Sequence, residues 1–102
     1  MIFNSIKAGV RIDRLTPQML LGHNVVCSVY NGFNYGCVLT SGNDGDHMVN
    51  SLHYNGNACD YRISNIDKEQ LEPIREALKN ALGENFDIVL ENDHFHVEYD
   101  PK

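Results

Sequence analysis

The sequence has few basic residues for its length. Lys and Arg number eight against 14 Asp and Glu, which gives a formal net charge of −6 over 102 residues. Non-specific binding to nucleic acid or to anionic lipid needs Lys and Arg side chains that neutralise phosphates and release counterions. The acidic balance therefore argues against nucleic acid or a membrane surface as a partner.

Long apolar runs are also lacking. A membrane-spanning helix needs roughly 20 apolar residues in succession, and a secretory signal needs an apolar stretch behind a basic start. Neither occurs in the opening MIFNSIKAGVRIDRL or later in the sequence. We therefore expect cytoplasmic synthesis without a cleaved signal peptide.

The sequence has only three cysteines, and their spacing does not suggest disulfide pairs. Cys27, Cys37 and Cys59 are an odd number, at spacings that fit neither a disulfide framework nor a CxxC zinc site. We expect three reduced, mostly buried thiols, as is usual for synthesis in a reducing compartment.

The composition that remains is that of one globular domain over residues 1–102, with 42% hydrophobic and 22% charged residues. Thr16-Pro17 and Asp67 are typical helix starts, Gly83 is a typical stop, and Pro73 predicts an irregular start to the second helix. The predicted elements are a helix over 16–30, strands over 37–42 and 57–64, a helix over 67–83, and a hairpin of strands over 86–92 and 94–100. This order predicts an α+β fold with a small antiparallel sheet and helices packed on one of its faces.

Strand alternation predicts which side chains share the other face of that sheet. Apolar and polar residues alternate in NACDYRIS and in HFHVEYD. If the apolar sides of both strands pack on the helices, the opposite face carries Asp60, His94 and His96, with Glu98 further along the last strand.

Histidine and aspartate in this arrangement indicate a catalytic zinc site, which needs three protein ligands and an open fourth position. His53 and Asp60 are seven residues apart across a glycine turn, and HFH offers a third ligand. An unpaired carboxylate in the middle of a strand would be unfavourable, so Asp60 is expected to have a partner or a metal.

Two segments resemble the signatures of a known family. SLHYNGNACD and DHFHVEYD are similar to the Ser-x-His-x-x-Gly-x-Ala-x-Asp and Asp-His-x-His motifs of the M15 family of zinc peptidases, which includes D-Ala-D-Ala carboxypeptidases and phage L-alanyl-D-glutamate endolysins. The hedgehog signalling domain is a distant structural relative of that family. The resemblance implies a zinc cofactor held by His53, Asp60 and His96.

The resemblance also implies roles for neighbouring residues. The family's general base lies three residues before the last ligand, which is Asp93 here, and Glu91 is the rival for that role. His94 either assists near the scissile carbonyl or only supports the site. Ser51 matches a family serine that would bind substrate or orient His53.

One family feature is missing, because the segment before the first ligand reads TSGNDGDHM and has no arginine for the oxyanion. His47 could take that role, Arg62 could reach the site, or the metal could act alone. Asp44 and Asp46 could orient His47, and this acidic loop could also bind calcium, although its spacing is not that of an EF-hand.

The resemblance implies a peptidase that hydrolyses an amide in peptidoglycan stem peptides, at either the L-Ala-D-Glu or the D-Ala-D-Ala bond, and we expect it to be a monomer. A phage enzyme released through a separate membrane hole would fit the missing signal. The alternative is a non-catalytic zinc-binding interaction module, for which Asp93 would have no use. A third interpretation is a small α+β protein whose histidines have no joint role.

Overall fold

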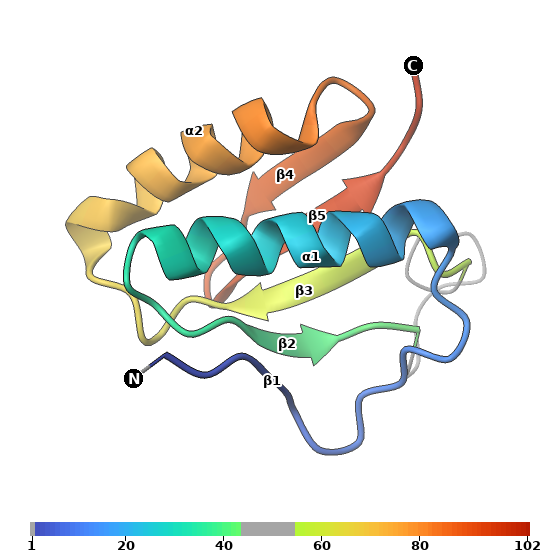
Figure 1. Ribbon diagram of the computed structural model, residues 1–102, viewed down its shortest axis with the longest axis horizontal. Coiled ribbons are helices and arrows are strands. Elements are labelled where there is room, and N and C mark those ends of the chain that lie inside the picture. The colour runs from blue at the N-terminus through green and yellow to red at the C-terminus, as the bar shows by residue number, and fades with distance from the viewer. Residues whose placement is uncertain (1, 44–54) are drawn as a thin grey trace.

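Two helices cover one face of a five-stranded sheet in the computed structural model, which describes residues 2–43 and 55–102 (Figure 1). The predicted α+β class is confirmed. In chain order the elements are β1 (Ser5–Ile6), α1 (Pro17–Gly32), β2 (Val38–Ser41), β3 (Ala58–Arg62), the 3₁₀ turn η1 (Lys68–Gln70), α2 (Leu71–Leu82), β4 (Phe86–Leu90) and β5 (His94–Tyr99).

The sheet is mixed, so the prediction of a purely antiparallel sheet is wrong at one edge. Its strand order is β1-β2-β3-β5-β4, and every pair is antiparallel except β1 with β2. The parallel pair is held by two backbone bonds of 2.9 Å, from the Ser5 amide to the Cys37 carbonyl and from the Lys7 amide to the Leu39 carbonyl. This short edge strand brings the start of the chain beside β2.

The helix boundaries follow the local chemistry of the sequence. The Thr16 hydroxyl accepts a hydrogen bond from the Met19 amide at 3.2 Å and so caps α1. The second helix opens with the 3₁₀ turn η1, which confirms the expected irregular start, and Gly83 ends it with φ of 85°.

The core lies between the helices and the apolar face of the sheet. Cys59 and Tyr61 of β3 and Phe95 and Val97 of β5 are fully buried, as the alternation predicts. The helices contribute Met19, Val26, Tyr30, Ile74 and Leu78. The three cysteines are free thiols, of which Cys37 and Cys59 are buried and Cys27 is partly buried.

No helix in the described ranges is both long enough and apolar enough to cross a membrane.

Gly56, in the turn before β3, occupies a backbone conformation that other residues rarely adopt. Its φ is 78°, and an added Cβ would lie 2.0 Å from the Arg14 carbonyl oxygen. We expect Gly56→Ala to lower the free energy of unfolding by at least about 2 kcal/mol, because left-handed strain and a backbone clash add. Urea unfolding followed by circular dichroism measures this change.

Gly32, the last residue of α1, is the matched control. An added Cβ at Gly32 meets nothing within 4 Å and its φ is not positive. Gly32→Ala should be neutral or slightly stabilising. Equal stability of the two variants would contradict the role assigned to Gly56.

Candidate functional site

The polar face of β3 and β5 brings the predicted residues together through strand register. Asp60 on β3 lies opposite His96 on β5, and Arg62 lies opposite His94. Since paired residues point to the same side of a sheet, all four side chains lie on the face away from the helices. The predicted placement of Asp60, His94 and His96 on this face is confirmed.

The closest contact in the site joins Asp60 to His96. The Asp60 Oδ1 atom lies 2.9 Å from His96 Nδ1, and the two side chains are only 15% and 20% exposed. The hydrogen bond to Asp60 raises the pKa of His96 above its usual value, burial opposes this, and the charges of Asp60 and Glu98 add to it. The mid-strand carboxylate therefore has the partner that its burial requires.

Glu98 completes a three-residue chain, and the sequence analysis assigned it no role. Its Oε1 atom lies 3.1 Å from His96 Nε2, so the imidazole is held between two carboxylates. Histidines that bind a metal through one ring nitrogen commonly donate the other N–H to a carboxylate. The alternation of HFHVEY placed Glu98 on the correct face, but the contact itself depends on the rotamers of both side chains.

His94 connects Asp93 to Asp60. His94 Nδ1 lies 2.6 Å from Asp93 Oδ1, and His94 Nε2 lies 3.6 Å from Asp60 Oδ1. The Asp93 side chain is 88% exposed at the turn between β4 and β5, whereas His94 is 27% exposed. Asp93 is therefore a solvent-accessible carboxylate whose orientation is fixed by a histidine of the same site.

Glu91 lies at the other end of the same turn. Its backbone amide donates to the His94 carbonyl at 2.9 Å, which closes the hairpin. Its side chain is exposed and is absent from the described lining of the cavity to which Asp93 contributes. Of the two carboxylates, Asp93 therefore contributes to the described lining of this cavity and Glu91 does not.

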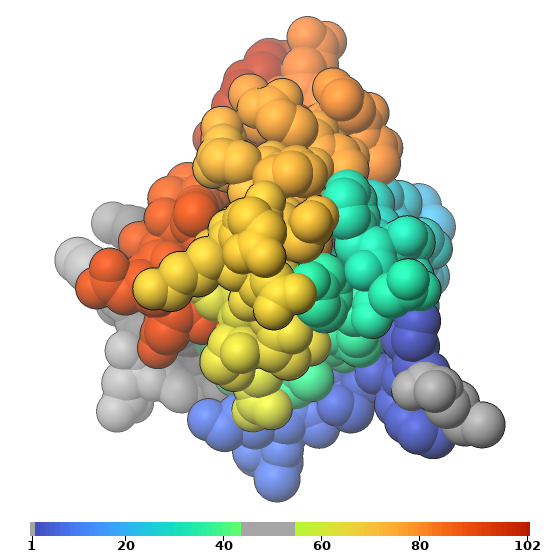
Figure 2. Space-filling view, turned by 90° about the vertical axis from the view of Figure 1, so that its left-hand side faces the viewer, coloured from blue at the N-terminus to red at the C-terminus, as the bar shows by residue number. Residues whose placement is uncertain are grey.

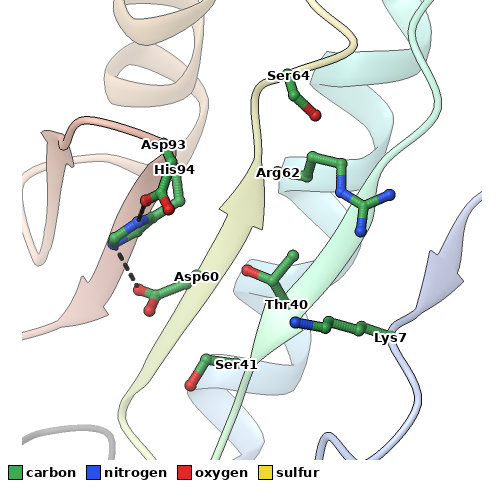
Figure 3. Close-up of a pocket in the computed structure, with 8 residues that line it drawn as sticks. All are labelled: Lys7, Thr40, Ser41, Asp60, Arg62, Ser64, Asp93 and His94. Atoms are coloured by element: carbon green, nitrogen blue, oxygen red, sulfur yellow. Dashed lines mark hydrogen bonds and ion pairs between the residues drawn. The ribbon is translucent and has the colours of Figure 1, made fainter.

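A cavity of about 360 Å³ opens beside these residues (Figure 3). In Figure 3 the His94 ring lies between Asp93 and Asp60, while the Arg62 guanidinium points over β2 and away from both carboxylates. The described lining consists of Lys7, Thr40, Ser41, Asp60, Arg62, Ser64, Asp93 and His94.

Figure 2 views the molecule from the end at which segments that contribute to this lining come together. There the turn between β4 and β5 (orange-red) lies next to the segment that follows β3 (yellow), and the segment after β1 (blue) lies below them. Three regions far apart in the sequence thus meet around one polar site.

Several predicted site residues lie outside the described residues. These are His53 as metal ligand, Ser51 as substrate-binding residue, His47 as oxyanion partner, and Asp44 and Asp46 beside it. The two ends of their segment can be placed. Ser41 lines the cavity, and β3 begins at Ala58, two residues before Asp60.

The donor set of Asp60 and His96 fits a zinc ion. Ligand atoms of a tetrahedral zinc are about 3.4 Å apart, as bond lengths of about 2.0–2.2 Å require. The Asp60 and His96 atoms are 2.9 Å apart, so a small separation of the two side chains would admit a metal between them. Glu98 could remain bound to the other ring nitrogen.

The described residues contain one cluster of three possible ligand atoms that lie within 4.8 Å of one another, and it shares only Glu98 with the site. It consists of Asp87, Glu98 and Asp100. The Lys102 ammonium lies 3.1 Å from both Asp87 carboxylate oxygens and 3.7 Å from Asp100, so two of the three carboxylates are already paired with a cation. Asp60 and His96 do not belong to a group of three such ligand atoms within the described residues, and His53, the third ligand predicted from the sequence, lies outside them.

The sequence matches no protein-family model, and no curated protein matches it significantly. The observations that bear on function are the two sequence motifs and the geometry of β3, β5 and the cavity.

Proposed function

We propose that this chain is a zinc-dependent peptidase that hydrolyses an amide bond in peptidoglycan stem peptides. The observation that supports it most is the chain from Asp60 through His96 to Glu98, because a buried histidine between two carboxylates is the arrangement of a metal ligand with its orienting partner. The resemblance of the two motifs to M15 zinc peptidases supports the substrate class.

The metal would be held by His53, Asp60 and His96. When bound, zinc supplies a Lewis acid that polarises the scissile carbonyl and makes a water acidic enough to attack at neutral pH. Asp93 accepts the proton of the attacking water and returns it to the leaving amine. His94 holds the Asp93 carboxylate through the 2.6 Å contact and keeps it directed at the cavity.

The oxyanion partner remains a choice between His47, Arg62 and the metal alone. The Arg62 guanidinium points over β2 and away from Asp60, which does not favour the oxyanion role for it. His47 is therefore the preferred side chain in this proposal. The enzyme would act on the cell wall, and release through a phage-encoded membrane hole is the proposed route to it.

The decisive experiment combines metal analysis with digestion of peptidoglycan. The purified protein should carry about one zinc per chain, and chelation should remove the zinc and the activity together. Mass analysis of peptides released from purified peptidoglycan should reveal new amino termini that identify the cleaved bond. A folded protein that binds no zinc would overturn the proposal, whereas zinc binding without any hydrolysis would favour the non-catalytic module.

Glu98 offers a test of how the metal ligand is oriented. We expect Glu98→Gln to weaken zinc binding by about 10–100-fold, the usual effect of losing a carboxylate partner of a ligating histidine. A competition titration against a chromophoric chelator measures the dissociation constant.

Asp100→Asn is the matched control for this prediction. Asp100 belongs to the same acidic cluster as Glu98 but is exposed, with its ion pair to Lys102 at 3.7 Å. Its replacement should leave zinc affinity unchanged. Equal weakening in both variants would mean that Glu98 acts only through the net charge of this face.

A further inference from the structure

Arg62 is a half-buried cation whose charge has no carboxylate partner among the described residues. Among the described residues, Asp60 lies on the same strand and face as Arg62, but it contacts both His96 and His94. Arginine at a partly buried site normally forms a paired, often bidentate contact with a carboxylate or phosphate. Within the part of the chain that the structure describes, a guanidinium at a cavity wall without such a partner is therefore the unusual feature of this site.

Lys7 brings a second cation to the same cavity. It follows β1 directly, and its backbone is held against Leu39 of β2 by a 2.9 Å hydrogen bond. No ion pair of Lys7 is found within the described ranges, and Lys7 and Arg62 both line the cavity. Figure 3 shows the two side chains on the same side of the cavity, on either side of Thr40, with Asp60 and His94 on the other side.

The cavity is thus divided by charge. One side has the carboxylates and imidazole that the proposed function assigns to metal binding and proton transfer, and the other has two cations with the Thr40 and Ser64 hydroxyls near them. We propose that Arg62 and Lys7 form a carboxylate-binding subsite that anchors the free α-carboxylate of the residue contributing the scissile nitrogen.

If the proposed function holds, the substrate offers this subsite a single occupant, which is the α-carboxylate next to the scissile amide. In the D-Ala-D-Ala bond, the residue that contributes the nitrogen is a terminal D-alanine with a free carboxylate. In the L-Ala-D-Glu bond it is D-glutamate, which continues the stem through its side-chain carboxyl and so keeps its α-carboxylate free. Both candidate bonds therefore place one carboxylate at the same position next to the scissile amide.

A monoanionic carboxylate suits the site better than a phosphate. Asp60 and Asp93 line the same cavity, and their negative charges would repel a dianion more strongly than a single carboxylate. The planar guanidinium of Arg62 also matches the two oxygens of a carboxylate.

The subsite can be tested without metal or turnover. Metal-free protein, dialysed until no chelator remains, is titrated with N-acetyl-D-alanyl-D-alanine and with its neutral C-terminal amide, and binding is followed by NMR. We expect the acid to bind about tenfold or more tightly than the amide, since a charge-assisted hydrogen bond is lost in the amide. Arg62→Gln should remove this preference, and Lys7→Gln should reduce it by a smaller factor because Lys7 is exposed.

Two further variants separate a specific contact from general charge. Arg62→Lys keeps the charge but loses the planar fork, so it should retain part of the preference. Lys79→Gln removes one positive charge from α2, on the far side of the sheet, and should change nothing. The NMR spectrum of each free variant shows whether it is folded.

Three results would overturn the subsite. They are equal or undetectable binding of acid and amide at millimolar concentration, a preference that survives in Arg62→Gln, and tighter binding of inorganic phosphate than of the acid. A preference for the acid in a protein that neither binds zinc nor hydrolyses peptides would leave the subsite standing and refute the peptidase. Zinc-dependent hydrolysis by a protein that does not prefer the acid over the amide would support the peptidase and refute the subsite.

Discussion

Replacing Asp60 by Asn is expected to abolish zinc binding and, with it, peptide hydrolysis. Asp60 is one of two proposed ligands among the described residues, and it lies 2.9 Å from the other, His96. The neutral amide is a poor zinc ligand and no longer attracts the metal by charge. The loss of affinity should exceed the roughly 10–100-fold expected for an outer-sphere partner such as Glu98. Chelator competition and metal analysis of the dialysed protein measure it.

Asp87→Asn is the control for this substitution. Asp87 on β4 is also an aspartate of the sheet, but its carboxylate bonds to Lys102 at 3.1 Å and not to a histidine. Zinc affinity should be unchanged in this variant. If Asp60→Asn bound zinc as tightly as the unaltered protein, the proposed ligand set would be wrong.

The parts of the fold that depend on local chemistry could be predicted from the sequence. The hydroxyl of Thr16 and the permissive backbone of Gly83 mark helix ends wherever such residues flank an amphipathic run. Strand parity is equally local, because alternation alone decides that Asp60 and His96 face away from the apolar side. These two rules are sufficient to place Asp60 and His96, the two proposed ligands among the described residues, on one surface.

The edge strand β1 could not be predicted for a physical reason. It is two residues long, so it shows no alternation, and its pairing with β2 joins segments more than 30 positions apart. Only that long-range pairing brings Lys7 to the cavity. The placement of Lys7 beside Arg62 could therefore not be predicted from the sequence. The sequence suggests Arg62 only as a possible oxyanion partner.

Two positions of the family-like motif turn out to serve the fold. Gly56 makes the turn before β3 at a φ that other residues avoid, under the carbonyl of Arg14. Ala58 is fully buried. Gly56 and Ala58, which lie between His53 and Asp60 in the sequence, thus shape the turn and the start of β3. A motif of this kind can therefore include residues that serve the fold as well as proposed ligands. The role of His53 itself stays a prediction.

Replacing Asp93 by Asn is expected to remove most of the hydrolytic rate while leaving the metal in place. A positioned general base typically contributes about 10²–10⁴-fold to the rate, and Asn cannot accept the proton. The side-chain oxygen of Asn can still accept the hydrogen bond from His94 that Asp93 accepts at 2.6 Å, so the turn should keep its shape. The turnover rate on stem peptides should fall by that factor, with zinc affinity unchanged.

Glu91→Gln discriminates between the two acidic residues of the turn. Both carboxylates are exposed, but only Asp93 contacts His94 and contributes to the described cavity wall. The Glu91 variant should therefore keep nearly full activity, because the backbone bond from Glu91 to His94 does not involve its side chain. A large loss in Glu91→Gln together with an active Asp93→Asn would transfer the base role to Glu91. It would also mean that the hairpin turn rearranges when substrate binds, since Glu91 would then have to reach the cavity.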